Sequence, residues 1–150
     1  MTPQTEIYPM PAFPTLAVQD LAASTRWYQE VLNFQLIFEI PNAQGQIILT
    51  HLRWAKYADL LLVPERTDTL ATGPKGLGVT LTFMLFEDNV DELAARAKAK
   101  KATVLDGPVT QPWGVREVVI TDPDGYWLVF GQRAVEQNFD QVLAAIAQTP

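Results

Sequence analysis

The sequence has 150 residues, of which 48% are hydrophobic and 19% charged, so it predicts one ordinary well-packed domain or two small half-domains that share a core. A net charge of −6 leaves no basic stripe to neutralise nucleic-acid phosphates, and the absence of cysteine excludes disulfides, thiolate metal sites and cysteine nucleophiles. No secretory leader or bilayer-length apolar run is visible, so we expect a cytoplasmic protein without nucleic-acid or membrane partners.

The first half of the chain predicts a strand, a helix and three more strands. Residues 1–11 contain three prolines and should form an irregular lead-in. We expect a strand over residues 13–18, a helix over 21–32 and a strand over 34–39, followed by a hairpin of 47–54 and 59–63. Asp20 is the expected N-cap of the helix, because its carboxylate can accept a hydrogen bond from the first turn.

The second half repeats this order after a linker, residues 65–78, that is rich in Gly, Pro and Thr. We expect a strand over 79–86, a helix capped by Asp88 or Asn89 that continues to residue 100, and a strand that starts at 103–105. Strands over 115–121 and 126–131 should be joined by the turn Asp122-Pro123-Asp124-Gly125. A final helix over 135–147 carries an apolar stripe and should pack on its own sheet or on a partner subunit.

The repeated order is the strongest signal of organisation. The expected caps Asp20 and Asp88 lie 68 positions apart, as do Leu61 and Val129 in the last strands of each half. The sequence therefore predicts an α+β fold of two tandem βαβββ repeats, residues 13–64 and 79–132, plus a C-terminal helix. Both sheets should curl around a shared cleft with the helices outside, and alternate residues of each strand should face that cleft.

The duplication, with VQDLAASTRWYQEVLNF after the first strand and DPDGYWLVFG near the end, resembles the vicinal oxygen chelate superfamily. That superfamily includes glyoxalase I, extradiol dioxygenases, fosfomycin resistance enzymes and bleomycin resistance proteins. The resemblance covers residues 13–132 and implies the fold more strongly than any one activity, because the scaffold hosts several chemistries.

In the metal-dependent members, four cleft-facing positions carry His or Glu ligands, and the matching positions here are Phe13, Leu61, Thr80 and Val129. Three apolar side chains and a hydroxyl cannot supply the donors that divalent metals need. The resemblance therefore implies the metal-free branch of the bleomycin resistance proteins, which bind planar or aromatic compounds and form dimers. We expect no metal, no cofactor and a homodimer.

Four side chains have both a structural and a functional interpretation. His51, the only histidine, is most simply a hydrogen-bonded strand residue, with Asp59 and Glu117 as candidate partners; the alternative is a polar anchor for a ligand. Trp113 and Trp127 serve either core packing or ligand stacking. Glu117, which should lie on the opposite strand face from Arg116, is either a salt-bridged carboxylate or a ligand or base in the cleft.

We therefore expect a metal-independent protein that sequesters an aromatic or antibiotic-like ligand and has no catalytic residues. The expected lining is Phe13, Thr15, Leu61, Thr80, Thr82, Trp113, Trp127 and Val129, with His51 and Glu117 as polar anchors. One alternative is a lyase, isomerase or oxygenase that uses His51 and Glu117, with or without a metal. Another is a structural or regulatory module without a ligand.

Overall fold

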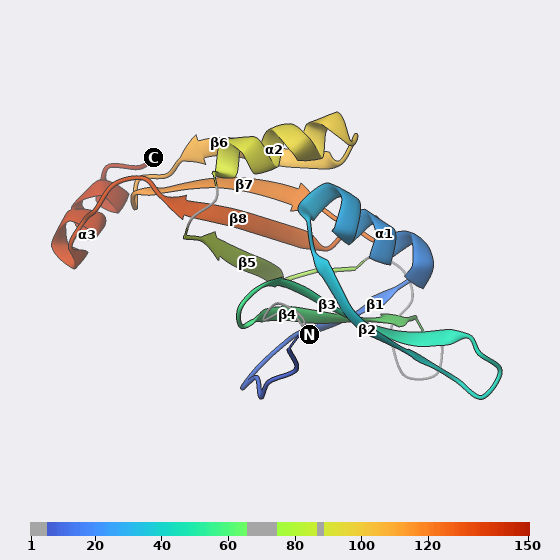
Figure 1. Cartoon of the computed structure of the whole chain (residues 1–150). Helices are drawn as coiled ribbons and strands as arrows, with labels where there is room; N and C mark the ends of the chain where they lie inside the picture. Colours follow the sequence, from blue (N-terminus) through green and yellow to red (C-terminus); the bar gives the residue numbers. More distant parts are fainter. Residues whose placement is uncertain (1–5, 66–74, 87–88) are drawn as a thin grey trace. The chain divides into compact units, whose positions relative to one another are not determined.

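The computed structural model describes residues 6–65, 75–86 and 89–150, and they form two separate four-stranded mixed sheets with three helices (Figure 1). The first sheet contains β1 (Thr15–Val18), β2 (Gln35–Pro41), β3 (Ile47–Ala55) and β4 (Ala58–Pro64) in the order β1-β4-β3-β2. β1 pairs with β4 in parallel and the other pairs are antiparallel. β1 begins two residues later than expected, after Pro14, which has no N–H to contribute to a ladder.

α1 (Leu21–Leu32) has the bounds that the sequence predicts. The Asp20 side chain accepts a hydrogen bond from the Ala23 N–H at 2.9 Å, and Asn33 ends the helix in the left-handed conformation, with φ of 57°. The buried face of the helix packs on β3 and β4. Its residues are Ser24, Thr25, Tyr28, Val31 and Leu32, and they meet the fully buried Leu52, Leu60 and Leu62 of the sheet.

The turn at Asp122–Gly125 belongs by its contacts with this first unit, although it is distant in sequence. The buried Tyr28 hydroxyl donates to Asp122 Oδ2 at 2.8 Å, and Asp124 Oδ1 accepts from the Gln19 N–H at 2.8 Å. The turn therefore supplies the hydrogen-bond acceptor for the Tyr28 hydroxyl in the core of the first unit.

The second unit repeats the pattern with β5 (Thr80–Leu85), α2 (Val90–Ala99), β6 (Thr103–Thr110), β7 (Val115–Thr121) and β8 (Trp127–Arg133) in the order β5-β8-β7-β6. β5 and β8 are parallel, as β1 and β4 are. The Asn89 side chain caps α2 by accepting hydrogen bonds from the Asp91 and Glu92 N–H groups at 2.8 and 3.3 Å, while Asp88, the other expected cap, lies outside the described residues. The prediction of two βαβββ modules in an α+β fold is confirmed.

α3 (Phe139–Ala147) begins four residues later than the apolar stripe predicts. The Asn138 side chain accepts from the Gln141 N–H, and the Gln141 side chain accepts from the Asn138 N–H, so this capping box sets the start. None of its residues is buried, and Phe139 remains 74% exposed, so the expected packing on its own sheet is not seen. Among the described residues, no helix is long and apolar enough to cross a membrane.

Candidate ligand-binding site

One face of the first sheet is covered by α1, and strand alternation turns the other residues of β3 and β4 to the opposite face. Leu52 on β3 and Leu60 and Leu62 on β4 are fully buried on the helix side. The intervening residues, His51, Arg53, Asp59 and Leu61, are on the face away from the helix. The strand register pairs His51 with Leu61 and Arg53 with Asp59, so all four residues are neighbours. We call this surface the open face.

The polar residues of the open face form a connected trio. Arg53 donates from Nε to Asp59 Oδ1 at 2.7 Å and from Nη2 to Oδ2 at 2.8 Å, and the two side chains are only 4% and 3% exposed. His51 Nε2 lies 2.7 Å from the same Oδ2, and its side chain is 14% exposed. The hydrogen bonds from Arg53 to Asp59 raise the pKa of the guanidinium above its ordinary value.

The N-terminal segment is irregular, as expected, but it is fixed to the open face. Arg53 Nη1 donates to the Glu6 carbonyl oxygen at 2.7 Å, and the guanidinium carbon lies 4.2 Å from the centre of the Tyr8 ring. The Tyr8 hydroxyl accepts from the Tyr57 N–H at 2.9 Å, and the two rings meet edge to face at 5.1 Å. Arg53 therefore joins the N-terminal segment to the other two members of the trio, Asp59 and His51.

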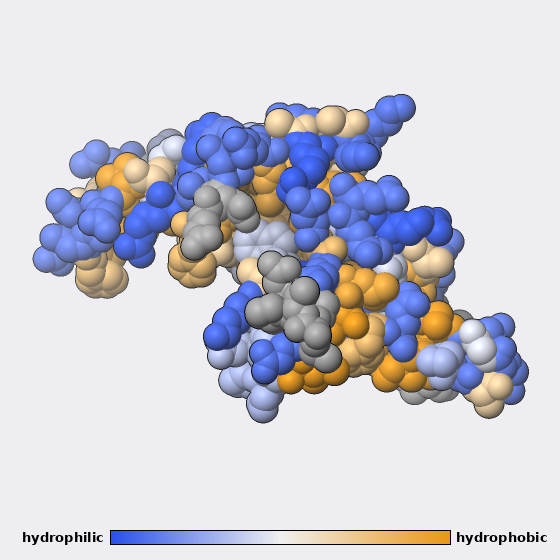
Figure 2. All heavy atoms as spheres, in the orientation of Figure 1, coloured by the Kyte–Doolittle hydropathy of each residue, from blue (hydrophilic) through white to orange (hydrophobic). Residues whose placement is uncertain are grey.

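Between this segment and the sheet is a cavity of about 230 Å³, which we call the apolar pocket. Most of its lining is aliphatic or aromatic, and His51 and Asp59 supply the polar groups. The lining residues are Ile7, Tyr8, Met10, Phe13, Phe38, His51, Asp59 and Leu61. The Phe38 ring meets the His51 ring edge to face, with centres 4.8 Å apart. Ligand pockets span roughly 300–1,000 Å³, so this one suits a single aromatic ring or part of a larger ligand. Figure 2 shows apolar side chains gathered over the first sheet, whereas the visible surface of α2 is mostly hydrophilic.

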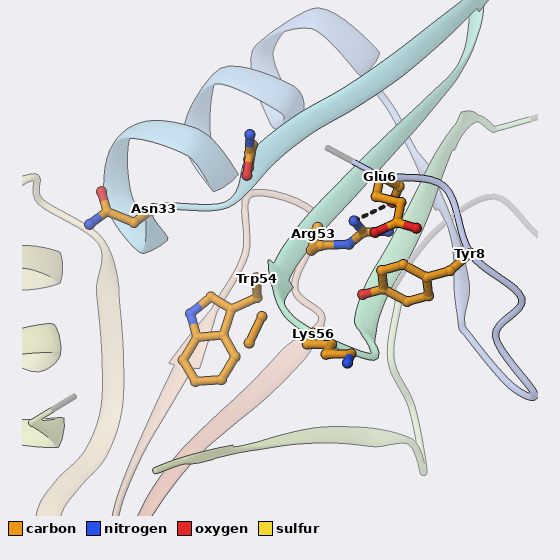
Figure 3. Close-up of a pocket in the computed structure, with 8 residues that line it drawn as sticks. Glu6, Tyr8, Asn33, Arg53, Trp54 and Lys56 are labelled. Atoms are coloured by element: carbon orange, nitrogen blue, oxygen red, sulfur yellow. Dashed lines mark hydrogen bonds between the residues drawn. The ribbon is translucent and has the colours of Figure 1, made fainter. Parts of the chain in front are cut away.

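A second cavity of about 480 Å³ lies at the end of β3 and the C-terminus of α1 (Figure 3). Its lining is more polar and consists of Glu6, Tyr8, Asn33, Gln35, Arg53, Trp54, Ala55 and Lys56. Figure 3 shows Arg53 pointing toward Glu6, with Tyr8 beside it. None of the ten predicted site residues lines this cavity, so we take the apolar pocket as the candidate site.

The predicted site residues fall into two groups, one in each unit. Phe13, His51 and Leu61 line the apolar pocket, and Thr15 pairs with Leu61 in the strand register. The second group belongs to the second unit and comprises Thr80, Thr82, Trp113, Glu117, Trp127 and Val129. Thr80 pairs with Trp127 and Thr82 with Val129, on the face opposite to the buried Phe83, Leu128 and Phe130.

Two polar contacts orient the second group. The Trp113 indole Nε1–H donates to Glu117 Oε1 at 2.9 Å, so this carboxylate has a hydrogen-bond partner. The adjacent Arg116 points the other way and forms a bidentate pair with Asp91 on α2, with both distances 2.8 Å. The hydrogen bonds from Arg116 lower the pKa of Asp91. Arg116 and Glu117 thus lie on opposite faces of β7, as the strand alternation predicts.

The residues of this chain do not fit a divalent metal at the family's positions. Phe13, Leu61, Thr80 and Val129 offer no imidazole or carboxylate. Across the described part of the chain, no three His, Cys, Asp or Glu side chains come together as a metal-binding group. His51 and Asp59 would supply only two donors, and both oxygens of Asp59 already accept from Arg53. We therefore derive no chemistry through a metal.

Sequence reasoning named Asp59 as a partner for His51 but missed four residues of the pocket. Phe38 could have been found from the hairpin register, because it lies opposite His51 on β2. The other three, Ile7, Tyr8 and Met10, come from the lead-in, where no periodic pattern marks them. Their position depends on tertiary contacts with Arg53 and Tyr57.

Three kinds of comparison place this chain among known proteins. The family model described as "Glyoxalase/Bleomycin resistance protein/Dioxygenase superfamily" matches residues 11–130. The Mycobacterium bovis protein called "Uncharacterized protein Mb0911c" is 31% identical over 137 residues, covering 89% of this chain and 90% of that protein.

Solved structures share the fold at lower identity. TnmS3, an antibiotic binding protein from Streptomyces sp. CB03234, has a TM-score of 0.65 and 24% identity, covering 85% of this chain and 97% of that one. Lactoylglutathione lyase from Agrobacterium tumefaciens has a TM-score of 0.61 and 23% identity, covering 83% and 94%. A binding protein and an enzyme are therefore both similar in fold, and only the family follows from the comparisons. This chain belongs to the glyoxalase/bleomycin resistance protein/dioxygenase superfamily.

Proposed function

We propose that this protein binds a small aromatic or largely apolar molecule in the apolar pocket and sequesters it without metal-dependent chemistry. The observation that carries the proposal is a cavity with aliphatic and aromatic walls and one pair of polar groups, His51 and Asp59. Such a composition is typical of small-molecule sites, in which apolar walls supply affinity and a few polar groups fix orientation. A relative in fold, TnmS3, is an antibiotic binding protein, which is consistent with this use of the scaffold.

The six predicted residues of the second unit remain a prediction as further ligand contacts. Trp127 is half exposed on its sheet and could stack on a ring, and Trp113 is oriented by Glu117. Substituting Trp127 with Ala should weaken binding if this residue contacts the ligand, and should leave it unchanged if only the first unit does.

Calorimetric titration with a panel of planar aromatic compounds and aromatic antibiotics tests the proposal. A Leu61→Trp variant fills the pocket and should reduce affinity at least tenfold. A Leu143→Trp variant is the matched control, because Leu143 lies half exposed on α3 and lines no part of the pocket. Phe13→Ala removes an aromatic wall of the pocket and should also weaken binding. Because it adds no bulky side chain, it tests the pocket even if Leu61→Trp fails to fold. If no panel member binds the wild-type protein, the proposal is wrong.

A second candidate is an enzyme that uses His51 as a base. The contact that favours it is the 2.7 Å hydrogen bond between His51 and Asp59, because a carboxylate often orients a catalytic imidazole. This function would be supported if the wild-type protein and Glu117→Gln convert a panel ligand to product and His51→Phe does not. Ligand recovered unchanged after long incubation would support sequestration.

The expected homodimer, cytoplasmic location and role in antibiotic resistance also remain predictions. Light scattering coupled to size exclusion would give the mass of the assembly, and a dimer would appear at about twice the chain mass of 16.7 kDa. Expression in a sensitive host, with growth measured against each compound that binds, would test resistance.

A further inference from the structure

The polar trio specifies which hydrogen-bonding groups the pocket offers to a ligand. Ionised Asp59 has only acceptor oxygens, so His51 Nε2 must carry a hydrogen to make the 2.7 Å contact. In a neutral imidazole the other nitrogen, Nδ1, is then an acceptor. No described residue forms a hydrogen bond with Nδ1, and this atom is not among the buried side-chain atoms that lack a partner. Nδ1 is therefore an unused acceptor that solvent can reach.

The first requirement for a ligand is therefore a hydrogen-bond donor for Nδ1, and the charges of the trio define the second. Arg53 contributes one positive charge and Asp59 one negative charge, and the two are joined by a bidentate contact at 2.7 and 2.8 Å. With a neutral imidazole the trio carries no net charge, so it offers nothing to balance an anionic ligand. Burying an unbalanced anion beside apolar walls is costly, and a neutral hydrogen-bond donor avoids that cost.

The walls define the third requirement. Phe38 meets His51 edge to face, and Phe13 and Tyr8 also line the pocket, so the cavity beside the imidazole is bordered by aromatic rings. Its volume of about 230 Å³ suits a single ring system. A flat aromatic group that carries a neutral O–H at its edge meets all three requirements.

We propose that the apolar pocket selects hydroxylated aromatic rings, with the phenolic O–H of the ligand donating to Nδ1 of His51. This inference rests on the proposed function, because it names the ligand class of the same site. It assigns Asp59 and Arg53 as positioning residues: Asp59 fixes the tautomer, and Arg53 neutralises Asp59. Carboxylates lack the donor and bring an unbalanced charge, and aryl ethers lack the donor alone.

The test compares 2-naphthol with 2-methoxynaphthalene and 2-naphthoate by calorimetric titration near pH 8. The naphthol should bind about tenfold more tightly than the ether, the factor that one net hydrogen bond supplies. The naphthoate should bind no better than the ether. In His51→Phe the naphthol and the ether should bind with about equal affinity. The affinity for the ether itself should change less than threefold, because Asp59 keeps both hydrogen bonds from Arg53.

A Phe38→Leu variant is the matched control. It removes the ring that meets His51 but keeps Nδ1, so it should weaken the naphthol and the ether alike and preserve their ratio. Equal binding of naphthol and ether by the wild-type protein, or a preference that survives in His51→Phe, would overturn this inference and leave the proposed function standing. Absence of binding by all three probes would overturn this inference, and the proposed function falls with it only if no member of the wider panel binds either.

Discussion

Replacing Asp59 with Asn should destabilise the protein strongly, because it removes the one negative charge of the buried trio. The substitution keeps the shape of the side chain but leaves Arg53, which is 4% exposed, without its counter-charge. Asn keeps one acceptor oxygen, but its NH₂ group is a donor and would be placed against an N–H donor of Arg53 or His51. At least one charge-assisted hydrogen bond to Arg53 is thus lost, and the remaining ones become weaker.

The expected cost is about 3–5 kcal/mol, the range found when one partner of a buried ion pair is removed. This is a large part of the roughly 5–15 kcal/mol that stabilises a typical domain. Urea unfolding at pH 7, followed by the fluorescence of the four tryptophans, measures it. For a denaturant slope of about 2 kcal/mol per molar, the midpoint should fall by roughly 1.5–2.5 M.

Asp91→Asn is the matched control, since Asp91 forms a bidentate pair of similar distances with Arg116 but has a side chain that is 52% exposed. Its unfolding midpoint should fall far less than that of Asp59→Asn, because solvent screens an exposed pair. The double variant Arg53→Met with Asp59→Leu should recover much of the stability, because apolar residues tolerate this site better than one unpaired charge. If Asp59→Asn and Asp91→Asn cost the same, the trio is not a desolvated ion pair and the reasoning is refuted.

Three further predictions concern the scaffold. Tyr28→Phe removes the hydrogen bond to Asp122 at 2.8 Å in the core and should lower the free energy of unfolding by about 1–3 kcal/mol; an unchanged midpoint would contradict this. Gly114→Ala should cost about 1–3 kcal/mol, because the residue has φ of +82° and an added Cβ would lie 2.7 Å from a backbone carbonyl oxygen. Amide exchange should then accelerate at the two N–H groups that bond to the Gly114 carbonyl, and protection equal to the wild type would argue against strain. Carboxyl NMR titration should place the pKa of Asp91 below its ordinary value of 3.8 and return it toward that value in Arg116→Gln or in high salt. The pair therefore stabilises the fold above the unfolded-state pKa and loses this effect as pH falls through the folded-state pKa, and a pKa insensitive to Arg116 would refute that.

The elements with local signals at both ends were predictable from sequence. α1 has an Asp cap before it and a left-handed Asn after it, and its predicted bounds are the observed ones. α3 shows the limit of periodicity, since the apolar stripe extends N-terminally beyond the helix and the capping box at Asn138 decides the start. The family register indicates that His51 faces the cleft, and in the structure this residue is on the face of the sheet away from α1.

The pocket itself was predictable only in part. Phe13, His51 and Leu61 follow from the strand pattern and the family register, and all three line the cavity. The other wall is the segment around Tyr8, whose position depends on a guanidinium 45 residues later in the chain, Arg53. No local propensity encodes such a contact, and three nearby prolines predict only irregular backbone.

The turn at Asp122–Gly125 has a consequence for the synthesis of the chain. Domains usually fold in order from the N-terminus as they leave the ribosome, at about 5–20 residues per second. The first unit cannot complete all its contacts in that order, because the carboxylate that accepts from the Tyr28 hydroxyl is encoded 94 residues downstream. After residue 75 is made, about 50 further residues are needed to reach Gly125, which takes roughly 3–10 seconds at those rates. During that interval the nascent first repeat has a tyrosine without its Asp122 acceptor, so the maturation of the first half of the chain waits for a turn encoded in the second.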